Sequence, residues 1–123
     1  MKRNTLDMAL LFDFYGELLT EKQQTLFDLY YNQDFSLGEI AENEGISRQG
    51  VHDAIARAEQ QLCAFEERMH CVERARQMQT AVSRIQAQTA VLAASQDPAV
   101  QAAATKIQSA VKEMVEEPWR LKD

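Results

Sequence analysis

Residues 36–62 read SLGEIAENEGISRQGVHDAIARAEQQL, and this stretch predicts two short helices joined by a tight glycine turn. Ser36 and Glu39 have the spacing of a capping box, which starts the first helix. Gly45 ends that helix, because glycine adopts the left-handed backbone conformation at little cost. Ser47 then caps the second helix. The pattern therefore predicts a helix-turn-helix motif.

The second helix of the motif has one apolar face and one polar face. Its apolar residues repeat at helical spacing and predict a buried stripe: Val51, Ala54, Ile55, Ala58 and Leu62. In DNA-binding versions of the motif the opposite face enters the major groove, where arginine suits guanine or phosphate and glutamine suits adenine. We therefore predict contact with nucleic acid, DNA or RNA, through five residues: Ser47, Arg48, Gln49, His52 and Arg57. Of these, Ser47 also serves as the cap, and Asp53 near the same face would repel phosphate.

The charge of the chain leaves a second interpretation open. The 123 residues carry a net charge of −6, and residues 20–62 hold eight acidic and three basic side chains, a local net charge of −5. A protein that neutralises phosphates usually presents a basic patch. The exposed face of the motif is therefore also a candidate surface for a partner protein.

Composition and spacing predict an all-α fold. Glycine and proline are scarce, whereas alanine, glutamine, glutamate and leucine are abundant. A helix is expected over residues 5–18, and Thr20 with Gln23 forms a second capping box that opens an aromatic-rich helix. The aromatic side chains are predicted to lie in the core: Phe12, Phe14, Tyr15, Phe27, Tyr30, Tyr31 and Phe35. These helices and the motif form a first domain, residues 1–62.

Beyond Leu62 the recognition helix is predicted to continue, without a linker, into a second domain at residues 63–123. A phase slip in its apolar spacing predicts a bend, or a change of packing partner, near residues 73–78. Asp97 and Pro98 have the order expected of an N-cap and a first helical residue, so a final helix starts there. The C-terminal half is thus predicted to be a helical hairpin.

Each arm of this hairpin carries only a narrow apolar stripe. The stripes comprise Ala75, Met78, Val82, Ile85, Thr89 and Leu92 on one arm, and Val100, Ala103, Ile107, Val111 and Met114 on the other. Two such helices bury little surface alone. We expect two copies to pack as an antiparallel bundle, which makes the protein a homodimer. In the alternative, the hairpin folds back on its own N-terminal domain.

The sequence offers no catalytic constellation, phosphate-binding loop or cofactor motif, so no enzymatic activity is predicted. Cys63, His70 and Cys71 lie on what the pattern predicts to be one helix, where they converge poorly on a metal ion and the cysteines cannot bridge. No signal peptide or membrane-spanning run is visible, which predicts a cytoplasmic protein that does not contact membrane. Trp119 follows the last helix, either as a docking element or as part of a frayed tail.

Several elements within residues 8–70 resemble, in the same order, the YlxM family of small helix-turn-helix proteins. They are LFDFY, LLT-K-Q, LYY, DFSLGEIAE and SRQ-V-D-I. The resemblance implies an N-terminal domain like region four of sigma factors, followed by long helices, in a non-enzymatic cytoplasmic bacterial protein. Genes of this family commonly neighbour those of the signal recognition particle, which implies an accessory or regulatory role in that pathway.

Two features depart from the family pattern, and one agrees with it. Glu44 stands where the motif normally has an apolar residue, so the first motif helix is either packed less tightly or directs Glu44 to solvent. The region after Ala75 is rich in alanine and glutamine rather than lysine, which does not favour RNA contact through the tail. Asp53 agrees with the family, which implies that an acidic group on the recognition face belongs to the usual role of the fold.

Three functional hypotheses follow. The first is a nucleic-acid-binding accessory or regulatory protein of the signal recognition particle pathway. The second is a protein-interaction module that binds protein components of that particle, which the local negative charge favours. The third is an autonomous transcriptional regulator, whose dimer would have to hold two recognition helices about 34 Å apart.

Overall fold

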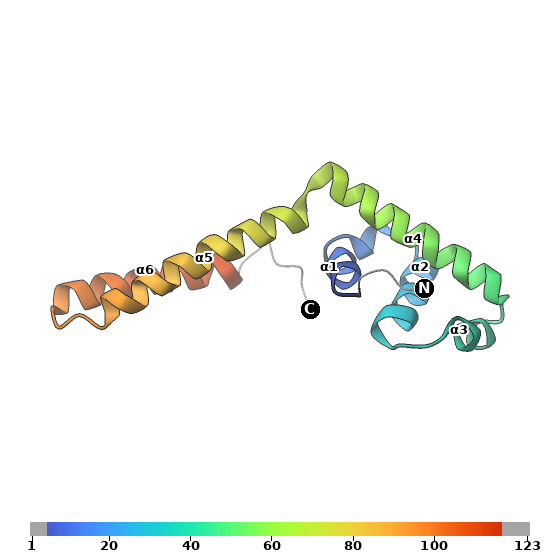
Figure 1. The fold of residues 1–123 in the computed structure, drawn as a ribbon, viewed down its shortest axis with the longest axis horizontal. Coiled ribbons are helices and arrows are strands. Elements are labelled where there is room, and N and C mark those ends of the chain that lie inside the picture. Colours follow the sequence, from blue (N-terminus) through green and yellow to red (C-terminus); the bar gives the residue numbers. More distant parts are fainter. Residues whose placement is uncertain (1–4, 117–123) are drawn as a thin grey trace. The chain divides into compact units, whose positions relative to one another are not determined.

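The computed structural model describes residues 5–116, and all regular secondary structure in that range is helical. Its elements are α1 (Thr5–Tyr15), the 3₁₀ turn η1 (Gly16–Leu18), α2 (Glu21–Phe27), the π-helical turn η2 (Asp28–Asn32), α3 (Leu37–Glu44), α4 (Arg48–Met69), α5 (Cys71–Ala93) and α6 (Pro98–Glu116) (Figure 1). The all-α prediction is confirmed. The expectations for Trp119 and the tail around it fall outside the described residues.

The chain divides into two compact units, and the division falls between Val72 and Glu73. In the N-terminal unit α4 packs against α1, α2 and α3, which Figure 1 shows gathered along one side of it. The largest fully buried side chains come from all of these elements except α1: Leu26, Phe27, Ile40, Val51 and Leu62. The recognition helix is therefore also the central packing element of this unit.

Aromatic rings join α1 and α2 to this core. Phe27 stacks on Phe12 and on Tyr31, with ring centroids 4.7 and 4.5 Å apart, respectively. Tyr15 lies against Phe65 of α4 at 5.9 Å. All seven aromatic residues assigned to the core are buried in it or packed against it, which confirms the prediction.

The junction between α4 and α5 differs from the predicted continuous helix. α4 does run past Leu62, but it ends at Met69 because His70 adopts the left-handed conformation, with φ 56°. The break thus precedes the bend predicted at residues 73–78. The N-terminal compact unit extends to Val72.

Side chains from α1 and α4 hold this junction. The buried Tyr15 hydroxyl donates to Glu66 Oε1 at 2.6 Å and accepts from the Cys71 amide at 3.0 Å. The Val72 amide donates to the same Glu66 oxygen at 3.0 Å. Glu66 and Tyr15 therefore supply acceptors for the first amides of α5, which have none inside their own helix. This long-range support stabilises the break in the helix at His70.

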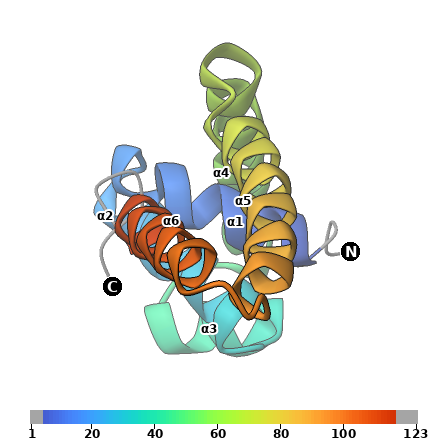
Figure 2. The same cartoon turned by 90° about the vertical axis from the view of Figure 1, so that its left-hand side faces the viewer.

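The C-terminal unit is a hairpin, in which a short turn reverses the chain between α5 and α6 (Figures 1 and 2). The predicted start of α6 is confirmed, because α6 begins at Pro98 and Asp97 Oδ1 accepts from the Ala99 amide at 2.9 Å. One series of residues on the two arms is buried: Val82, Thr89, Ala104 and Val111. The sequence pattern placed Ala103 in the apolar stripe of this arm, but the structure leaves Ala103 exposed and buries Ala104.

A second series on the same arms stays about two-fifths exposed. It comprises Met78, Ile85 and Leu92 of α5, and Ile107 and Met114 of α6, with exposed fractions of 37 to 41%. Its members on each arm are seven residues apart, as are those of the buried series. Each arm therefore has two apolar seams, and the hairpin by itself buries only one of them.

Candidate nucleic-acid interface

The helix-turn-helix is held by local hydrogen bonds at each of its corners. Ser36 and Glu39 form the reciprocal capping box predicted for α3, with bonds of 2.8 and 3.1 Å. Gly45 is left-handed, with φ 70°, and the next amide donates back to the Ala41 carbonyl at 3.1 Å. Ser47 Oγ accepts from the Gly50 amide at 2.9 Å and so starts α4. The motif geometry matches the prediction, and Glu44 is exposed to solvent.

The structure places all five predicted contact residues at the surface of α4 or its cap. Ser47, Arg48, Gln49, His52 and Arg57 are each exposed. The Ser47 hydroxyl oxygen accepts the capping bond from the Gly50 amide, and its proton can still be donated to a ligand. Neither arginine makes an ion pair within residues 5–116, although the charge of Arg57 acts on the nearby Asp53.

Asp53 organises the centre of the exposed face. Its Oδ1 accepts from Gln49 Nε2 at 2.9 Å and lies 3.3 Å from His52 Nδ1. The bonds from Gln49 and His52, in that order, hold the pKa of Asp53 below its usual range, and the charge of Arg57 adds to the effect. Two of the predicted contact residues, Gln49 and His52, are thus in contact with a carboxylate, and binding a base would require them to exchange partners.

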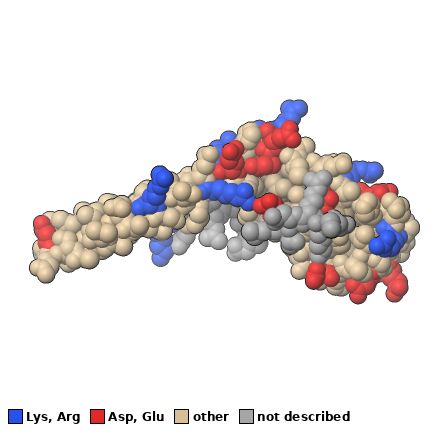
Figure 3. Space-filling model, in the orientation of Figure 1, with Lys and Arg blue, Asp and Glu red and all other residues tan. Residues whose placement is uncertain are grey.

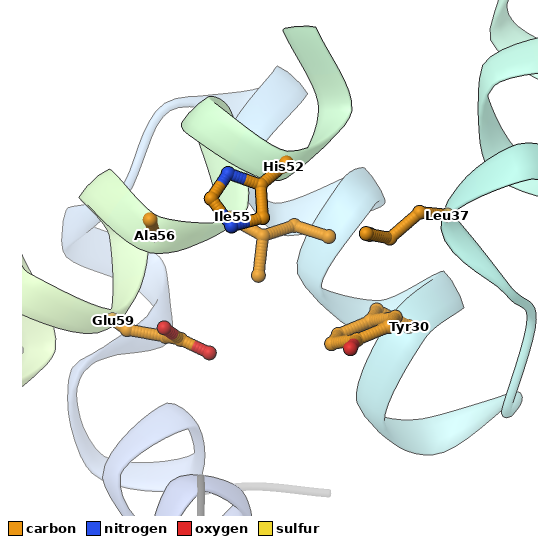
Figure 4. Close-up of a pocket in the computed structure, with 6 residues that line it drawn as sticks. All are labelled: Tyr30, Leu37, His52, Ile55, Ala56 and Glu59. Carbon is orange, nitrogen blue, oxygen red and sulfur yellow. The ribbon is translucent and has the colours of Figure 1, made fainter. Parts of the chain in front are cut away.

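His52 lies on one flank of α4, beside a small pocket. Figure 4 shows its ring above this pocket, with Glu59 and Tyr30 on other sides of it. The pocket is also lined by Leu37, Ile55 and Ala56, and its volume of about 30 Å³ suits a single water molecule. It is too small for a nucleobase.

The burial of one acidic residue, Glu59, was not predicted from the sequence. Its carboxylate is buried, 8% exposed, and accepts a hydrogen bond from the Tyr31 hydroxyl. The signal was its place between two buried positions of the same stripe, Ala58 and Leu62, four residues after Ile55. Part of the local negative charge is therefore inside the protein and does not face a ligand.

Arg57 lies on the opposite flank of α4 from His52. The five positions between them turn the helix by about 140° at 100° per residue. Arg57 lines an open hollow together with Gly50, Ala54 and residues of α2. Gln49 and Arg57 stand four positions before and after Asp53, so these three residues follow one ridge of α4, whereas His52 lies on the other side of that ridge.

Within residues 5–116 no group of three or more His, Cys, Asp or Glu side chains is placed to hold a metal ion. Cys63 and Cys71 form no disulfide within the described residues, and both are half-buried. The expectation that both lie on one helix is wrong, since the break at His70 puts Cys63 in α4 and Cys71 in α5. No helix in the described part of the chain is long and apolar enough to cross a membrane.

The all-α fold and the α3–turn–α4 geometry define a helix-turn-helix protein. Residues 2–101 match the sequence model of the family UPF0122, whose description is "Putative helix-turn-helix protein, YlxM / p13 like". The chain belongs to this family, which confirms the resemblance to YlxM. The family is one of helix-turn-helix proteins and not of enzymes.

Relatives in several bacteria share much of the chain. A UPF0122 protein of Caldanaerobacter subterraneus subsp. tengcongensis is 48% identical over 85 residues, which cover 69% of this chain and 73% of the relative. A UPF0122 protein of Thermoanaerobacter pseudethanolicus has the same identity and coverage. One of Listeria monocytogenes serotype 4b is 44% identical over 88 residues, or 72% of this chain and 80% of the relative.

Proposed function

We propose that the protein is a non-enzymatic, cytoplasmic accessory or regulatory protein that binds nucleic acid through α4, and that it acts in the signal recognition particle pathway. The observation that carries the nucleic-acid proposal is the pair of exposed cations, Arg48 and Arg57, on a recognition helix that leaves both without an ion pair within residues 5–116. The link to the particle rests on membership of the YlxM family.

The arrangement of α4 favours modest affinity. Arg48 lies in the first turn of the helix, the part of a recognition helix that meets base edges or phosphates. Gln49 and His52 must give up contacts with Asp53 before they bind a base, and that carboxylate repels an approaching phosphate. The cations therefore supply most of the attraction, and binding should be strongly salt-dependent.

Fluorescence anisotropy across a salt series tests this proposal. The full-length protein is titrated into labelled signal recognition particle RNA and into duplex DNA of arbitrary sequence. We expect Arg48→Gln and Arg57→Gln to weaken binding, while Arg84→Gln, an exposed cation of α5, serves as the matched control. If the wild-type protein binds neither nucleic acid at low salt, direct contact is refuted.

We also propose that the C-terminal hairpins of two copies pack together into a homodimer. The second seam, Met78, Ile85, Leu92, Ile107 and Met114, is about two-fifths exposed in one copy. Between Gln77 and Thr105 the only charged residues are Arg84 and Asp97, so this region is unusually free of charge for a solvent-exposed helix pair. A second hairpin would supply the apolar surface that the second seam lacks.

The energetic balance makes this dimer easy to disrupt. Burying the exposed part of the second seam in both copies contributes roughly 6–12 kcal/mol, against an association cost of about 4–15 kcal/mol. Ile85→Lys should therefore produce monomers at micromolar concentration. Ala87→Lys, about 200° away around α5, should not. Sedimentation velocity distinguishes these outcomes, and a monomeric wild-type protein would exclude the dimer.

A second candidate function, binding to a basic protein surface, is favoured by the exposed acids of α3. Glu39, Glu42 and Glu44 are all exposed, and acidic side chains gather on the lower part of the N-terminal unit in Figure 3. Asp53 adds a carboxylate with a lowered pKa on α4. Calorimetric titration against the GTPase subunits of the particle tests this alternative. Absence of heat with the subunits, together with binding to RNA, would reject it.

A further inference from the structure

The hollow beside α4 brings together two cations that are 35 residues apart in the sequence. Its volume is about 540 Å³, and it is open to solvent. Lys22 of α2 and Arg57 of α4 both line it. The complete lining is Thr20, Lys22, Gln23, Ile46, Gly50, Ala54, Arg57 and Gln61. None of these eight residues is acidic, although residues 20–62 carry a net charge of −5.

Small residues and a bridging hydrogen bond explain why the hollow exists. Gly50 and Ala54 lie one turn apart on α4, and their small size leaves the space beside the helix unfilled. Gln23 Nε2 donates to Gln61 Oε1 at 2.7 Å, which ties α2 to α4 along one wall. The two helices that carry the cations are thus fixed relative to each other before any ligand binds.

The two cations are available for a ligand. Both side chains are exposed, and neither makes an ion pair in the part of the chain that the structure describes. They are also two of the three basic residues between Thr20 and Leu62. Packing of α2 on α4 therefore concentrates most of the positive charge of this acidic region in one place.

We propose that the Lys22–Arg57 hollow binds a phosphodiester group in the backbone of the nucleic acid that α4 contacts, an inference that rests on the proposed function. The guanidinium of Arg57 offers several donors in a fixed geometry, Lys22 offers a compact charge, and the lining glutamines add neutral polar groups. This set suits a phosphate, which has several acceptor oxygens and no donor.

The position of the hollow on a flank of α4 supports the phosphate assignment. A helix is about 10–12 Å across with its side chains, and the major groove of B-DNA is about 12 Å wide. When such a helix lies in the groove, its flanks face the sugar-phosphate walls. Lys22 and Arg57 lie on one flank, whereas the other holds the small pocket with the buried Glu59. Lys22, which lies outside the motif, would therefore contact the sugar-phosphate backbone of the nucleic acid.

Salt dependence provides the test, because a lost phosphate contact changes its slope. Binding of full-length protein is measured by fluorescence anisotropy on two unrelated DNA duplexes and one single-stranded RNA. We expect Lys22→Gln to weaken binding to both duplexes equally and to reduce the slope of log K against log salt by about 0.9, or about 0.7 on the single strand. If Lys22→Gln reduces the slope on the DNA duplexes alone, the bound phosphate belongs to DNA. If it reduces the slope on the single-stranded RNA alone, the phosphate belongs to RNA.

Two matched variants make the result specific. Lys106→Gln removes an exposed lysine of α6 and should leave the slope unchanged. If Lys22 and Arg57 hold the same phosphate, the double variant should lose less than the sum of the two single losses. An unchanged slope for Lys22→Gln, with wild-type protein that binds, overturns the phosphate site and leaves the proposed function intact. Failure of the wild-type protein to bind at low salt overturns both.

Discussion

Removing a single oxygen atom at Tyr15 tests the account of the α4–α5 junction. The side chain is 2% exposed, and its hydroxyl bonds to Glu66 at 2.6 Å and to the Cys71 amide at 3.0 Å. Tyr15→Phe keeps the ring against Phe65 and removes both bonds. Since a hydrogen bond to a charged group contributes about 1.5–3 kcal/mol, we expect the free energy of unfolding to fall by that amount.

Urea unfolding followed by circular dichroism measures this loss. The variant and the wild-type protein are compared at one protein concentration, because dimerisation makes apparent stability concentration-dependent. Glu66→Gln keeps an acceptor oxygen and should cost less than Tyr15→Phe. Glu67→Gln changes the neighbouring exposed carboxylate and should stay within about 0.5 kcal/mol of wild type.

The raised pKa of the Tyr15 hydroxyl should make the free energy of unfolding depend on pH. Burial, followed by the bond to Glu66, raises the pKa of Tyr15 well above its usual value. The folded state therefore holds this proton more tightly than the unfolded state, whose tyrosine pKa is about 10. The stabilisation is fully present below that pH and is lost as the pH rises above it. A Tyr15→Phe variant within 0.5 kcal/mol of wild type, with a superimposable profile from pH 9 to 11, would refute the reasoning.

Three further predictions concern the motif. Gly45→Ala should lower the free energy of unfolding by about 1–2 kcal/mol because φ is 70°. Gly38→Ala, inside α3 with no close neighbour, should instead raise it by about 0.5–1 kcal/mol. If the two substitutions shift the denaturant midpoint in the same direction, this reasoning is contradicted. Ser47→Ala removes the cap of α4 and should cost about 1 kcal/mol in the same assay, and no loss would argue against the cap. Gln49→Ala should raise the pKa of Asp53 toward its usual value, as measured by carboxyl NMR titration, and an unchanged pKa would show that the bond is absent in solution.

The ends of the helices could be predicted from sequence because their contacts are local. The capping boxes at Ser36 and Thr20 and the cap at Asp97 each join residues no more than three positions apart. Such contacts form whenever the chain becomes helical, whatever packs around it. The exposed face of α4 could also be predicted, because the helical spacing of its apolar residues can be recognised within a few turns of one helix.

The interactions among the site residues were only partly visible in the sequence. Gln49 and Asp53 are four positions apart, the spacing at which helix side chains meet, so their bond could have been predicted. The sequence-based prediction for Asp53 was repulsion of phosphate, and it did not include this bond. The split of His52 and Arg57 onto opposite flanks also follows from helix geometry, but what each flank contacts does not.

By itself, the sequence determined the helical class, the motif, its caps and its solvent-facing residues, because each depends on side chains within one or two helical turns. Only the tertiary structure decided that Tyr15 reaches Glu66 across 51 residues, and that Lys22 lines the same hollow as Arg57. These pairings depend on which helix faces meet when the core closes. Periodicity marks a face as buried or exposed, but it does not name the opposite face.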